Sequence, residues 1–328
     1  MSSSRLITCL ALVGLSFSLC AADLSAREER AMAQRASSAL KAALSLELRP
    51  PEEIRALILQ ERFAEFEALS KQYEEKFKTQ PKYESALIKL YSALNSADPS
   101  LLAKLDAWVA KRPSYISFGA RGTYKTARGY AARGTAYLRE TPASNIARMK
   151  QLHFEAIPDL LAAVKENSRF APAYVALIDI TRGAGNAMIA EKAHAEGVQW
   201  VPESYYIRYA YMVGLRPRWG GDYSLMQSYT DGLEQAARLN PRVWSLKGEI
   251  AAQLGHSAWL SDDYPEAIKH YTEALRFGDR LAFLKSRGKI FMTMKDYAAA
   301  RNDFTRYLAY SKSDPEVIGL LNRLDGMK

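Results

Sequence analysis

The sequence predicts an all-α fold in which helical hairpins stack side by side into a solenoid. Apolar residues recur every three or four positions over segments of 10 to 25 residues, which is the pattern of amphipathic helices. Long strict alternation of apolar and polar residues, typical of strands, is absent. The last third of the chain repeats itself at a fixed offset. The chain has 328 residues, of which 48% are hydrophobic and 25% charged, values that exclude a wholly disordered or collagen-like protein.

The first 22 residues are predicted to be a secretory signal peptide. Arg5 is the only charged residue before Asp23, and residues 6–19 are apolar or small. That run is too short to cross a bilayer, and no stretch of 18 apolar residues follows, so no transmembrane span is expected. We expect cleavage after Ala22 and export to the periplasm or the extracellular space. The alternative is an outer-membrane lipoprotein anchored through Cys20, although the preceding Leu19 is bulkier than such a signal prefers.

The chemistry-bearing residues give no sign of a catalytic site. Cys9 and Cys20 are the only cysteines, so the mature chain would have no disulfide, no cysteine zinc site and no thiol nucleophile. The four histidines form no metal-binding motif, and phosphate-loop, dinucleotide and serine-hydrolase motifs are absent. We therefore predict no cofactor, no metal and no catalytic residue. An envelope polysaccharide hydrolase on a helical solenoid remains an alternative, with Glu155 and Asp159 as the carboxylate pair to test.

The helices follow one another with short connections. Residues 23–50 form a weakly amphipathic segment, and Pro51 opens a stripe that runs to Phe77. Further stripes are predicted over 83–94 and 98–109, and Pro158 should kink or break the helix in which it lies. Short connections imply antiparallel neighbours, hence hairpins. The remaining predicted helices are 121–139, 145–167, 172–183, 187–197, 203–215, 222–239 and 242–260.

Two segments near the C-terminus repeat with an offset of 33 residues. DDYPEAIKHYTEAL at 262–275 aligns with KDYAAARNDFTRYL at 295–308, and each is preceded by a helix with a central glycine, Gly255 or Gly288. This pattern over 248–314 resembles the tetratricopeptide repeat, a 34-residue helix–turn–helix unit. Tyr307 departs from it, because the family has a small residue there. The resemblance implies a superhelix that binds peptides or partner helices on its inner face.

A capping helix is predicted after the repeats. Asp314 is its expected N-cap, Pro315 its first residue and Gly326 its stop. Its apolar stripe is predicted to consist of Val317, Ile318, Leu321 and Leu324.

The middle of the chain, about 55–235, resembles a bacterial domain of unknown function that is found beside such repeats. Trp108, the Arg- and Gly-rich run 119–137 and the segment PRWGG at 217–221 carry this resemblance. It implies no reaction. The predicted organisation is a signal peptide at 1–22, a weakly helical segment at 23–50, a degenerate helical-repeat domain at 51–240, and tetratricopeptide-like repeats with a capping helix at 241–328.

The net charge of +9 is concentrated in one stretch. Residues 111–150 hold nine basic residues against Glu140 alone: Lys111, Arg112, Arg121, Lys125, Arg128, Arg133, Arg139, Arg148 and Lys150. On a helix Arg121, Lys125 and Arg128 share one face, and Tyr124 and Tyr130 could add flat contact area. One interpretation is a docking face for an acidic protein tail or an anionic envelope polymer. The other is a solvated face whose cations pair with neighbouring carboxylates.

Two other features are candidates for binding. The tetratricopeptide resemblance places Lys285, Lys289 and Met292 on the inner face of the last repeat, where the lysines could pair with a partner's carboxylates or be ordinary surface residues. Trp219, Gly220 and Gly221 could form a ligand loop, but a structural turn between helices is favoured.

These observations predict an exported tetratricopeptide-like scaffold for protein–protein interaction in the cell envelope. The expected partner is an acidic protein or peptide, and no nucleic acid is expected because no nucleic-acid module accompanies the basic run. The alternatives are the polysaccharide hydrolase described above and a non-catalytic receptor for an anionic polymer.

Overall fold

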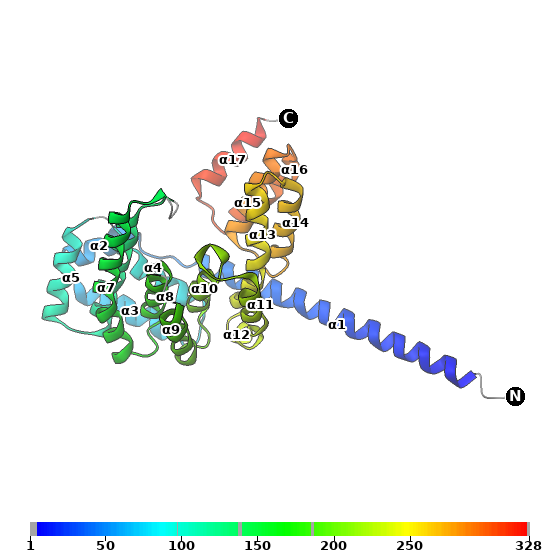
Figure 1. The fold of residues 1–328 in the computed structure, drawn as a ribbon, viewed down its shortest axis with the longest axis horizontal. Helices are drawn as coiled ribbons and strands as arrows, with labels where there is room; N and C mark the ends of the chain where they lie inside the picture. Colours follow the sequence, from blue (N-terminus) through cyan, green and yellow to red (C-terminus); the bar gives the residue numbers. More distant parts are fainter. Residues whose placement is uncertain (1–4, 97, 137–139, 185–186, 327–328) are drawn as a thin grey trace. The chain divides into compact units, whose positions relative to one another are not determined.

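The computed structural model describes residues 5–96, 98–136, 140–184 and 187–326, and every regular element in these ranges is a helix (Figure 1). This confirms the predicted all-α fold of helical hairpins. The chain divides into two compact units. One is Ala39–Leu246, and the other joins the N-terminal segment through Ser38 to Lys247–Lys328. Residues 1–4 of the predicted signal peptide and 137–139 of the predicted helix 121–139 lie outside the described residues.

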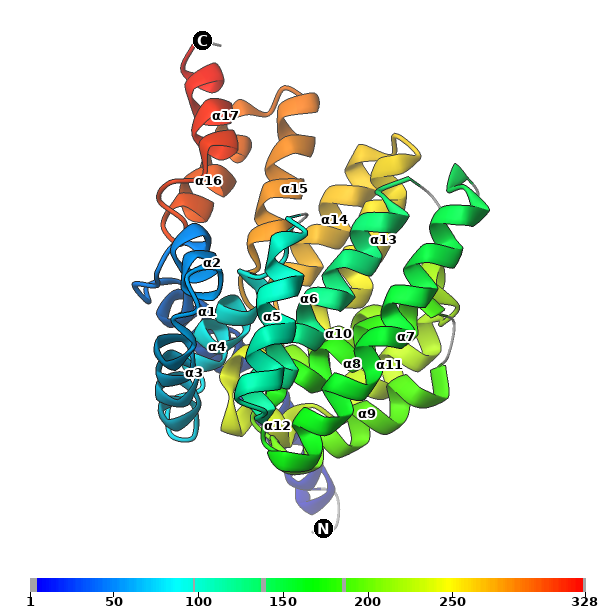
Figure 2. The same ribbon diagram turned by 90° about the vertical axis from the view of Figure 1, so that its left-hand side faces the viewer.

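The unit Ala39–Leu246 is built from consecutive hairpins. Its helices, after the end of α1, are α2 (Pro51–Leu59), α3 (Phe63–Phe77), α4 (Tyr83–Ser92), α5 (Ser100–Lys111), α6 (Tyr115–Arg133), α7 (Ala143–Glu166), α8 (Ala171–Ala184), α9 (Ala187–Trp200), α10 (Tyr205–Gly214), η2 (Pro217–Trp219), α11 (Tyr223–Asp231) and α12 (Glu234–Leu239). Neighbours in sequence pack together, most extensively α6 with α7 and α8 with α9 (Figure 2). The single helix expected over 222–239 is wrong, because Gly232 ends α11 and α12 follows.

Helix α8 contacts α4, α6 and α10, and α4 also contacts α6 and α10. Glu84 joins α4 to α10. Its buried carboxylate accepts hydrogen bonds from the Ser204 hydroxyl and from the backbone N–H groups of Tyr205 (2.8 Å) and Tyr206 (3.1 Å) at the start of α10. A carboxylate at a helix N-terminus satisfies N–H groups that have no partner within the helix. The hairpins therefore curve until α10 reaches α4.

The core of this unit contains a connected aromatic cluster. Phe63 stacks on Trp108 with ring centroids 4.9 Å apart, and Phe66 meets both Trp108 and Tyr91 edge to face at 5.4 Å. Tyr91 in turn contacts Phe170 at 5.1 Å. Such pairs contribute about 0.5–1.5 kcal/mol each beyond their buried area. These contacts fix α3, α4 and α5 against the start of α8.

Glycines explain the close packing of α6. A side chain at Gly119, Gly122 or Gly129 would overlap Phe170, Leu160 and His153, respectively. The helix begins at Tyr115 and not at the predicted 121, because Ser114 and Ser117 form a reciprocal capping box. The Arg- and Gly-rich sequence is therefore a packing pattern in which small residues face α7 and α8.

Helix α7 continues through Pro158 for 24 residues, which excludes the break that the sequence allowed. Proline has no N–H to donate to the carbonyl of Phe154, four residues earlier. The buried neighbours of Pro158, Asp159 and Leu160, hold the helix against α6 despite the missing bond.

The second unit confirms the two predicted repeats. They consist of α13 (Glu249–Leu260) with α14 (Tyr264–Leu275) and α15 (Leu281–Thr293) with α16 (Tyr297–Leu308). The start of the predicted helix 242–260 is the 3₁₀ segment η3 (Pro241–Gly248). Gly255 lies against Tyr271, and Gly288 lies against Phe304 at the equivalent position 33 residues later. Asp263 and Asp296 cap the second helix of each hairpin, so the repeat extends to the turns.

The predicted capping helix is α17 (Pro315–Asp325), with Asp314 as its N-cap. Its buried residues are Val317, Leu320 and Leu324, whereas Ile318 is 37% exposed. The predicted stripe was therefore wrong at Ile318. Tyr307, where the family has a small residue, is buried and donates a 2.5 Å hydrogen bond to the Asp314 carboxylate.

Helix α1 (Arg5–Leu44) is longer than the weak helix expected at 23–50. Its residues Ala33 and Ala36 lie against Gly278, in the turn between α14 and α15, and the Ser37 hydroxyl accepts a 2.9 Å hydrogen bond from the Asp279 N–H. Gly278 has φ +117°, a conformation that favours glycine, so this turn can approach α1 closely.

Candidate binding sites

The first half of the basic run is neutralised within the chain. Asp159 on α7 is 5% exposed and accepts two hydrogen bonds from the Arg121 guanidinium, at 2.8 and 2.6 Å, and one from Lys125 at 2.9 Å. Asp106 on α5 contacts the same arginine at 3.0 Å. The hydrogen bonds that Arg121 donates to Asp159 are the main cause that raises the pKa of Arg121. These two cations therefore hold α6 to its neighbours.

The cations before them are paired as well. Lys111 contacts Glu61 at 2.8 Å, and Arg112 contacts Glu67 at 2.9 Å. Both carboxylates lie on or beside α3, and the same Glu61 also binds Lys104, whose hydrogen bond is the first cause that lowers the pKa of Glu61 to about 2. Each cation in this half of the run is therefore paired with a carboxylate from another segment of the chain.

Tyr124 does not supply surface contact area, which corrects the sequence interpretation. Its side chain is 1% exposed and its hydroxyl donates a 2.8 Å hydrogen bond to the Asp98 carbonyl. Tyr130 is half-buried, donates to the Asp179 carbonyl and meets the His153 ring edge to face at 4.8 Å. Aromatic residues at helical spacing on α6 thus belong mainly to the packing.

The rest of the basic run lies toward the tip of the α6–α7 hairpin. Arg128 and Arg133 are half-buried on α6, and Arg133 donates to the carbonyls of Gly134 and Ala136. Arg148 and Lys150 are exposed on α7. Arg139 lies outside the described residues. The exposed basic side chains near this tip, Arg148 and Lys150, therefore lie outside the predicted row at 121–128.

Beside this tip, α7 exposes apolar side chains on its outer face. Phe154 is 76% exposed and Leu161 is 52% exposed, with Pro158 exposed between them. The spacing i, i+4, i+7 places the three on one face of the helix, which we call the α7 stripe. The opposite face of α7 is also apolar and is buried against the unit. The sequence analysis predicted a helix over 145–167 but did not single out this stripe, because apolar residues occur on both sides of that helix.

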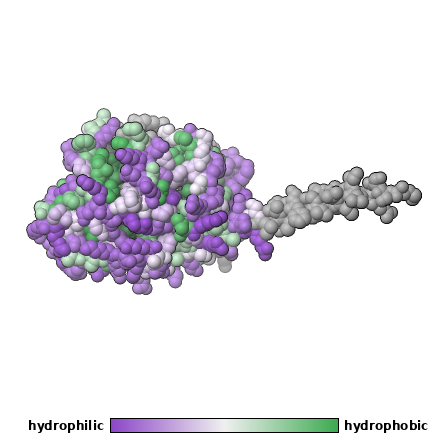
Figure 3. Space-filling view, turned by 90° about the horizontal axis from the view of Figure 1, so that it is seen from below, coloured by the Kyte–Doolittle hydropathy of each residue, from purple (hydrophilic) through white to green (hydrophobic). Residues whose placement is uncertain are grey.

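The space-filling view shows hydrophobic side chains in separate patches among hydrophilic ones on the face it presents (Figure 3). Isolated exposed apolar residues are normal on soluble proteins, whereas several on one helix face indicate an interaction surface.

The lysines of the last repeat are occupied by the capping helix. Glu316 on α17 contacts both Lys285 and Lys289, the latter at 2.5 Å, and Asp314 lies 3.6 Å from Lys285. The hydrogen bond that Lys285 donates to Glu316 is the first cause that raises the pKa of Lys285. Met292 is half-buried and packs against the core of its unit. An acidic partner on this face would have to compete with α17.

The Trp219 segment has the geometry of a turn. Gly220 ends η2 with φ +92°, and a side chain at Gly221 would overlap the Leu215 backbone. The Trp219 ring makes cation–π contacts with Arg182 and Arg218, whose guanidinium carbons lie 5.3 and 5.4 Å from the ring centroid. Both glycines are therefore required by the backbone.

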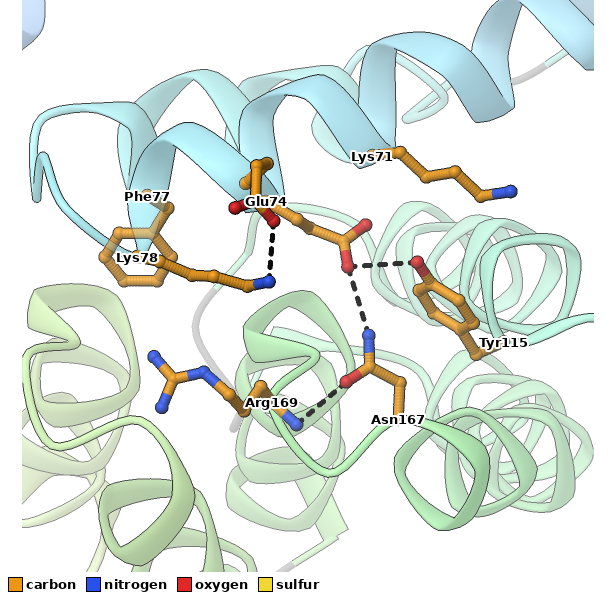
Figure 4. A pocket seen from close by; sticks show the side chains of 8 residues that line it. Lys71, Glu74, Phe77, Lys78, Tyr115, Asn167 and Arg169 are labelled. Atoms are coloured by element: carbon orange, nitrogen blue, oxygen red, sulfur yellow. Dashed lines mark hydrogen bonds and ion pairs between the residues drawn. The ribbon is translucent and has the colours of Figure 1, made fainter.

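A hollow of about 290 Å³ opens between α3, the start of α6 and the α7–α8 connection (Figure 4). Glu74 points into it between Tyr115 and Asn167, which donate hydrogen bonds of 3.1 and 3.0 Å to the same carboxylate oxygen. The other carboxylate oxygen accepts 2.7 Å from Ser70. Burial raises the pKa of Glu74, and these three donors act against that rise. Phe77 adds an apolar wall.

Charged side chains surround the mouth of the hollow. Lys78 pairs with Glu75 at 2.6 Å, and Arg169 is turned toward Glu203 and the Trp200 carbonyl. Lys71 has no ion pair among the described residues and extends along the rim (Figure 4). The sequence carried one weak signal for this site, since Ser70 and Glu74 are polar residues one turn apart beside an apolar stripe.

The carboxylate pair suggested for a hydrolase does not form an open acid–base site. Asp159 is held by Arg121 and Lys125, and Glu155 accepts a 3.1 Å hydrogen bond from Gln151. Within the described ranges, no group of three or more His, Cys, Asp or Glu side chains is arranged to hold a metal ion. No helix in the same ranges is both long enough and apolar enough to span a membrane.

Comparisons with known proteins do not place the chain in a family. No protein-family model matches it, and no curated protein matches it. Among solved structures, the chain is similar to one in the "Crystal structure of APC/C hetero-tetramer Cut9-Hcn1", with 15% sequence identity and a TM-score of 0.32. The similarity covers 73% of this chain and 45% of that one, so this chain spans less than half of its neighbour's length. The resemblance of 55–235 to a bacterial domain stays a prediction.

Proposed function

We propose that this protein is a binding scaffold that docks an acidic, amphipathic segment of a partner protein on the α6–α7 hairpin. The α7 stripe is the observation that carries the proposal. Phe154 and Leu161 project apolar surface that nothing in the described chain covers, on a helix whose other face is already packed. Burying such a side chain contributes about 1.5–3 kcal/mol, enough for two of them to anchor a partner helix.

The charges beside the stripe support an acidic partner. Arg148 and Lys150 are exposed one to two turns before Phe154, and Lys165 is exposed one turn after Leu161. Lys150 and Lys165 have no carboxylate partner within the described residues. A partner helix that places Leu or Phe on the stripe and Asp or Glu at its edges would be complementary in both respects. No catalytic role is assigned.

Capture from envelope extracts of the source cells tests this docking face. We expect the double variant Phe154→Asp, Leu161→Asp to lower the amount of the partner captured by the tagged full chain at least tenfold, because it removes two apolar anchors. The matched control is Leu225→Asp, Leu239→Asp, which changes two leucines that are each 49% exposed elsewhere in the same unit. Equal capture by the stripe variant and the control would contradict the proposal.

We also propose that the chain works outside the cytoplasm, on the strength of the apolar run that follows Arg5. Cell fractionation should recover it from the periplasm or the medium, and mass spectrometry of its N-terminus should start at Asp23. A lipid-modified Cys20 would instead support the lipoprotein alternative. An uncleaved protein in the cytoplasm would contradict export, but it would not contradict the proposal that the α7 stripe docks a partner.

A further inference from the structure

A second hollow in the unit Ala39–Leu246 is lined by an arginine that has no carboxylate in contact with it. This hollow has a volume of about 370 Å³ and lies between the end of α1, the α3–α4 turn, the start of α4 and the start of η3. Arg242 lines it and is partly buried. Within the ranges that the structure describes, its guanidinium makes no ion pair, although Glu84 is near enough to attract it. Arginine is rarely withdrawn from water without such a pair, which indicates an anion from outside the chain.

The Arg242 guanidinium is held in place with donors to spare. Its carbon lies 3.9 Å from the centroid of the Tyr205 ring and 4.8 Å from that of the Tyr206 ring. One nitrogen, Nη1, donates a 2.8 Å hydrogen bond to the Ser85 hydroxyl, and the Tyr206 hydroxyl is a second acceptor. A guanidinium has five N–H groups, so these two contacts leave donors unused. The nitrogens that lack a partner are open to solvent, so a ligand can reach them. An arginine fixed in this way can bind a carboxylate through two parallel hydrogen bonds.

The other ionisable groups of the hollow also favour an anion. They are Lys82 and Glu84. Lys82 makes no ion pair in the part of the chain that the structure describes, and its ammonium lies 5.4 Å from the centroid of the Tyr83 ring. Glu84 is 1% exposed, and its two oxygens already accept three hydrogen bonds from the start of α10. Two cations therefore line the hollow beside one carboxylate whose hydrogen bonds are made within the protein.

From these contacts we propose that the hollow binds a carboxylate that carries a small aliphatic group. The carboxylate pairs with Arg242, and the aliphatic group packs against the apolar part of the lining, which consists of Ala39, Ala42, Ala43, Pro81 and Pro241. Inorganic phosphate would match the cations but has no apolar part. A free aliphatic acid and the C-terminus of a peptide ending in leucine share the proposed chemistry. None of these lining residues belongs to the α7 stripe, so the site goes beyond the docking of a partner there.

Ligand-observed NMR with the full chain tests this site, with 4-methylpentanoate and its uncharged amide as probes. We expect saturable binding of the carboxylate and about tenfold weaker binding of the amide, which cannot form charge-assisted hydrogen bonds. Arg242→Lys keeps the charge but loses the planar fork, so it should weaken binding of the carboxylate about fivefold or more. The matched control is Arg238→Lys, an exposed arginine on α12, which should bind like the wild type. Absence of saturable binding, or equal binding of the amide, would overturn the proposal.

A second variant tests the position of the site without altering its charges. Ala42→Leu fills the hollow from α1 and should weaken binding of 4-methylpentanoate about tenfold, whereas Ala195→Leu, at an exposed alanine on α9, should not. Circular dichroism verifies that each variant is folded. Unchanged affinity in Ala42→Leu would contradict binding in this hollow.

Further probes separate the ligand classes and sources. Displacement of 4-methylpentanoate by an equal concentration of inorganic phosphate would overturn the aliphatic part of the assignment. Tighter binding of acetyl-Gly-Gly-Leu with a free carboxylate than of 4-methylpentanoate would indicate a peptide C-terminus as the source, and weaker binding a free acid. Capture by the α7 stripe is measured separately, so either idea can fail alone.

Discussion

Replacing Asp159 by asparagine is expected to destabilise the unit Ala39–Leu246 by about 3 kcal/mol, which corresponds to a fall in Tm of about 6–12 °C for a unit of this size. Asp159 is almost fully buried and is the common partner of Arg121 and Lys125, whose side chains are 19% and 16% exposed. Asparagine keeps the shape but not the charge, so it leaves two partly buried cations without their shared counterion.

Asp106→Asn is the matched control for this experiment. Asp106 contacts the same Arg121 at 3.0 Å, but its side chain is 52% exposed, and an exposed pair contributes about 0–1 kcal/mol. Thermal unfolding followed by circular dichroism should therefore separate the two variants by several degrees. Similar small losses would mean that Asp159 does not bridge α6 and α7. The same reasoning predicts that Arg121 cannot be reversed to glutamate without loss of stability.

Glu84 is expected to make the stability of the protein fall as the pH rises from about 5 to 7. Burial is the first cause that raises the pKa of Glu84 to about 7, from an ordinary value of 4.5, while the donors at the start of α10 and the nearby Arg242 act in the opposite direction. Over this interval the folded state keeps a proton that the unfolded state has released. Ionisation therefore favours unfolding, and the contribution is about 3 kcal/mol across the interval.

Unfolding in urea at several pH values tests this expectation. The glutamine of Glu84→Gln cannot ionise. The difference in free energy of unfolding between wild type and variant should therefore change by about 3 kcal/mol between pH 5 and 8, because the wild type becomes less stable relative to the variant as the pH rises. The control is Glu52→Gln, an exposed position on α2, which should retain the wild-type pH profile. A difference that stays constant, or that moves the other way, would show that the hydrogen bonds from α10 outweigh burial.

The repeat could be predicted from the sequence because its signals are local. Gly255 and Gly288, with Tyr271 and Phe304 opposite them, recur at one spacing within single hairpins, and the caps Asp263 and Asp314 lie directly before the helices they start. The error at Ile318 arose because Leu320 and Leu321 are adjacent and both apolar, so the buried face of the helix could be drawn through either of them.

The partners of the basic run could not be predicted in the same way. Asp159 lies 38 residues after Arg121, and Glu61 lies 50 residues before Lys111, so only the packing of α3, α5, α6 and α7 brings them together. The hollow likewise combines Glu74 with Asn167, 93 residues later. A charge count along the chain records the cations of one helix and cannot assign carboxylates from others.

The three glycines of α6 have a consequence for how the chain acquires its structure. Each glycine makes a helix less stable than alanine would by about 1 kcal/mol, so the isolated segment of α6 is a weak helix by about 3 kcal/mol. It becomes helical only as Phe170, Leu160 and His153 close over the positions where side chains are missing. We therefore expect other segments to nucleate folding, and α6 to become helical only when its neighbours pack against it.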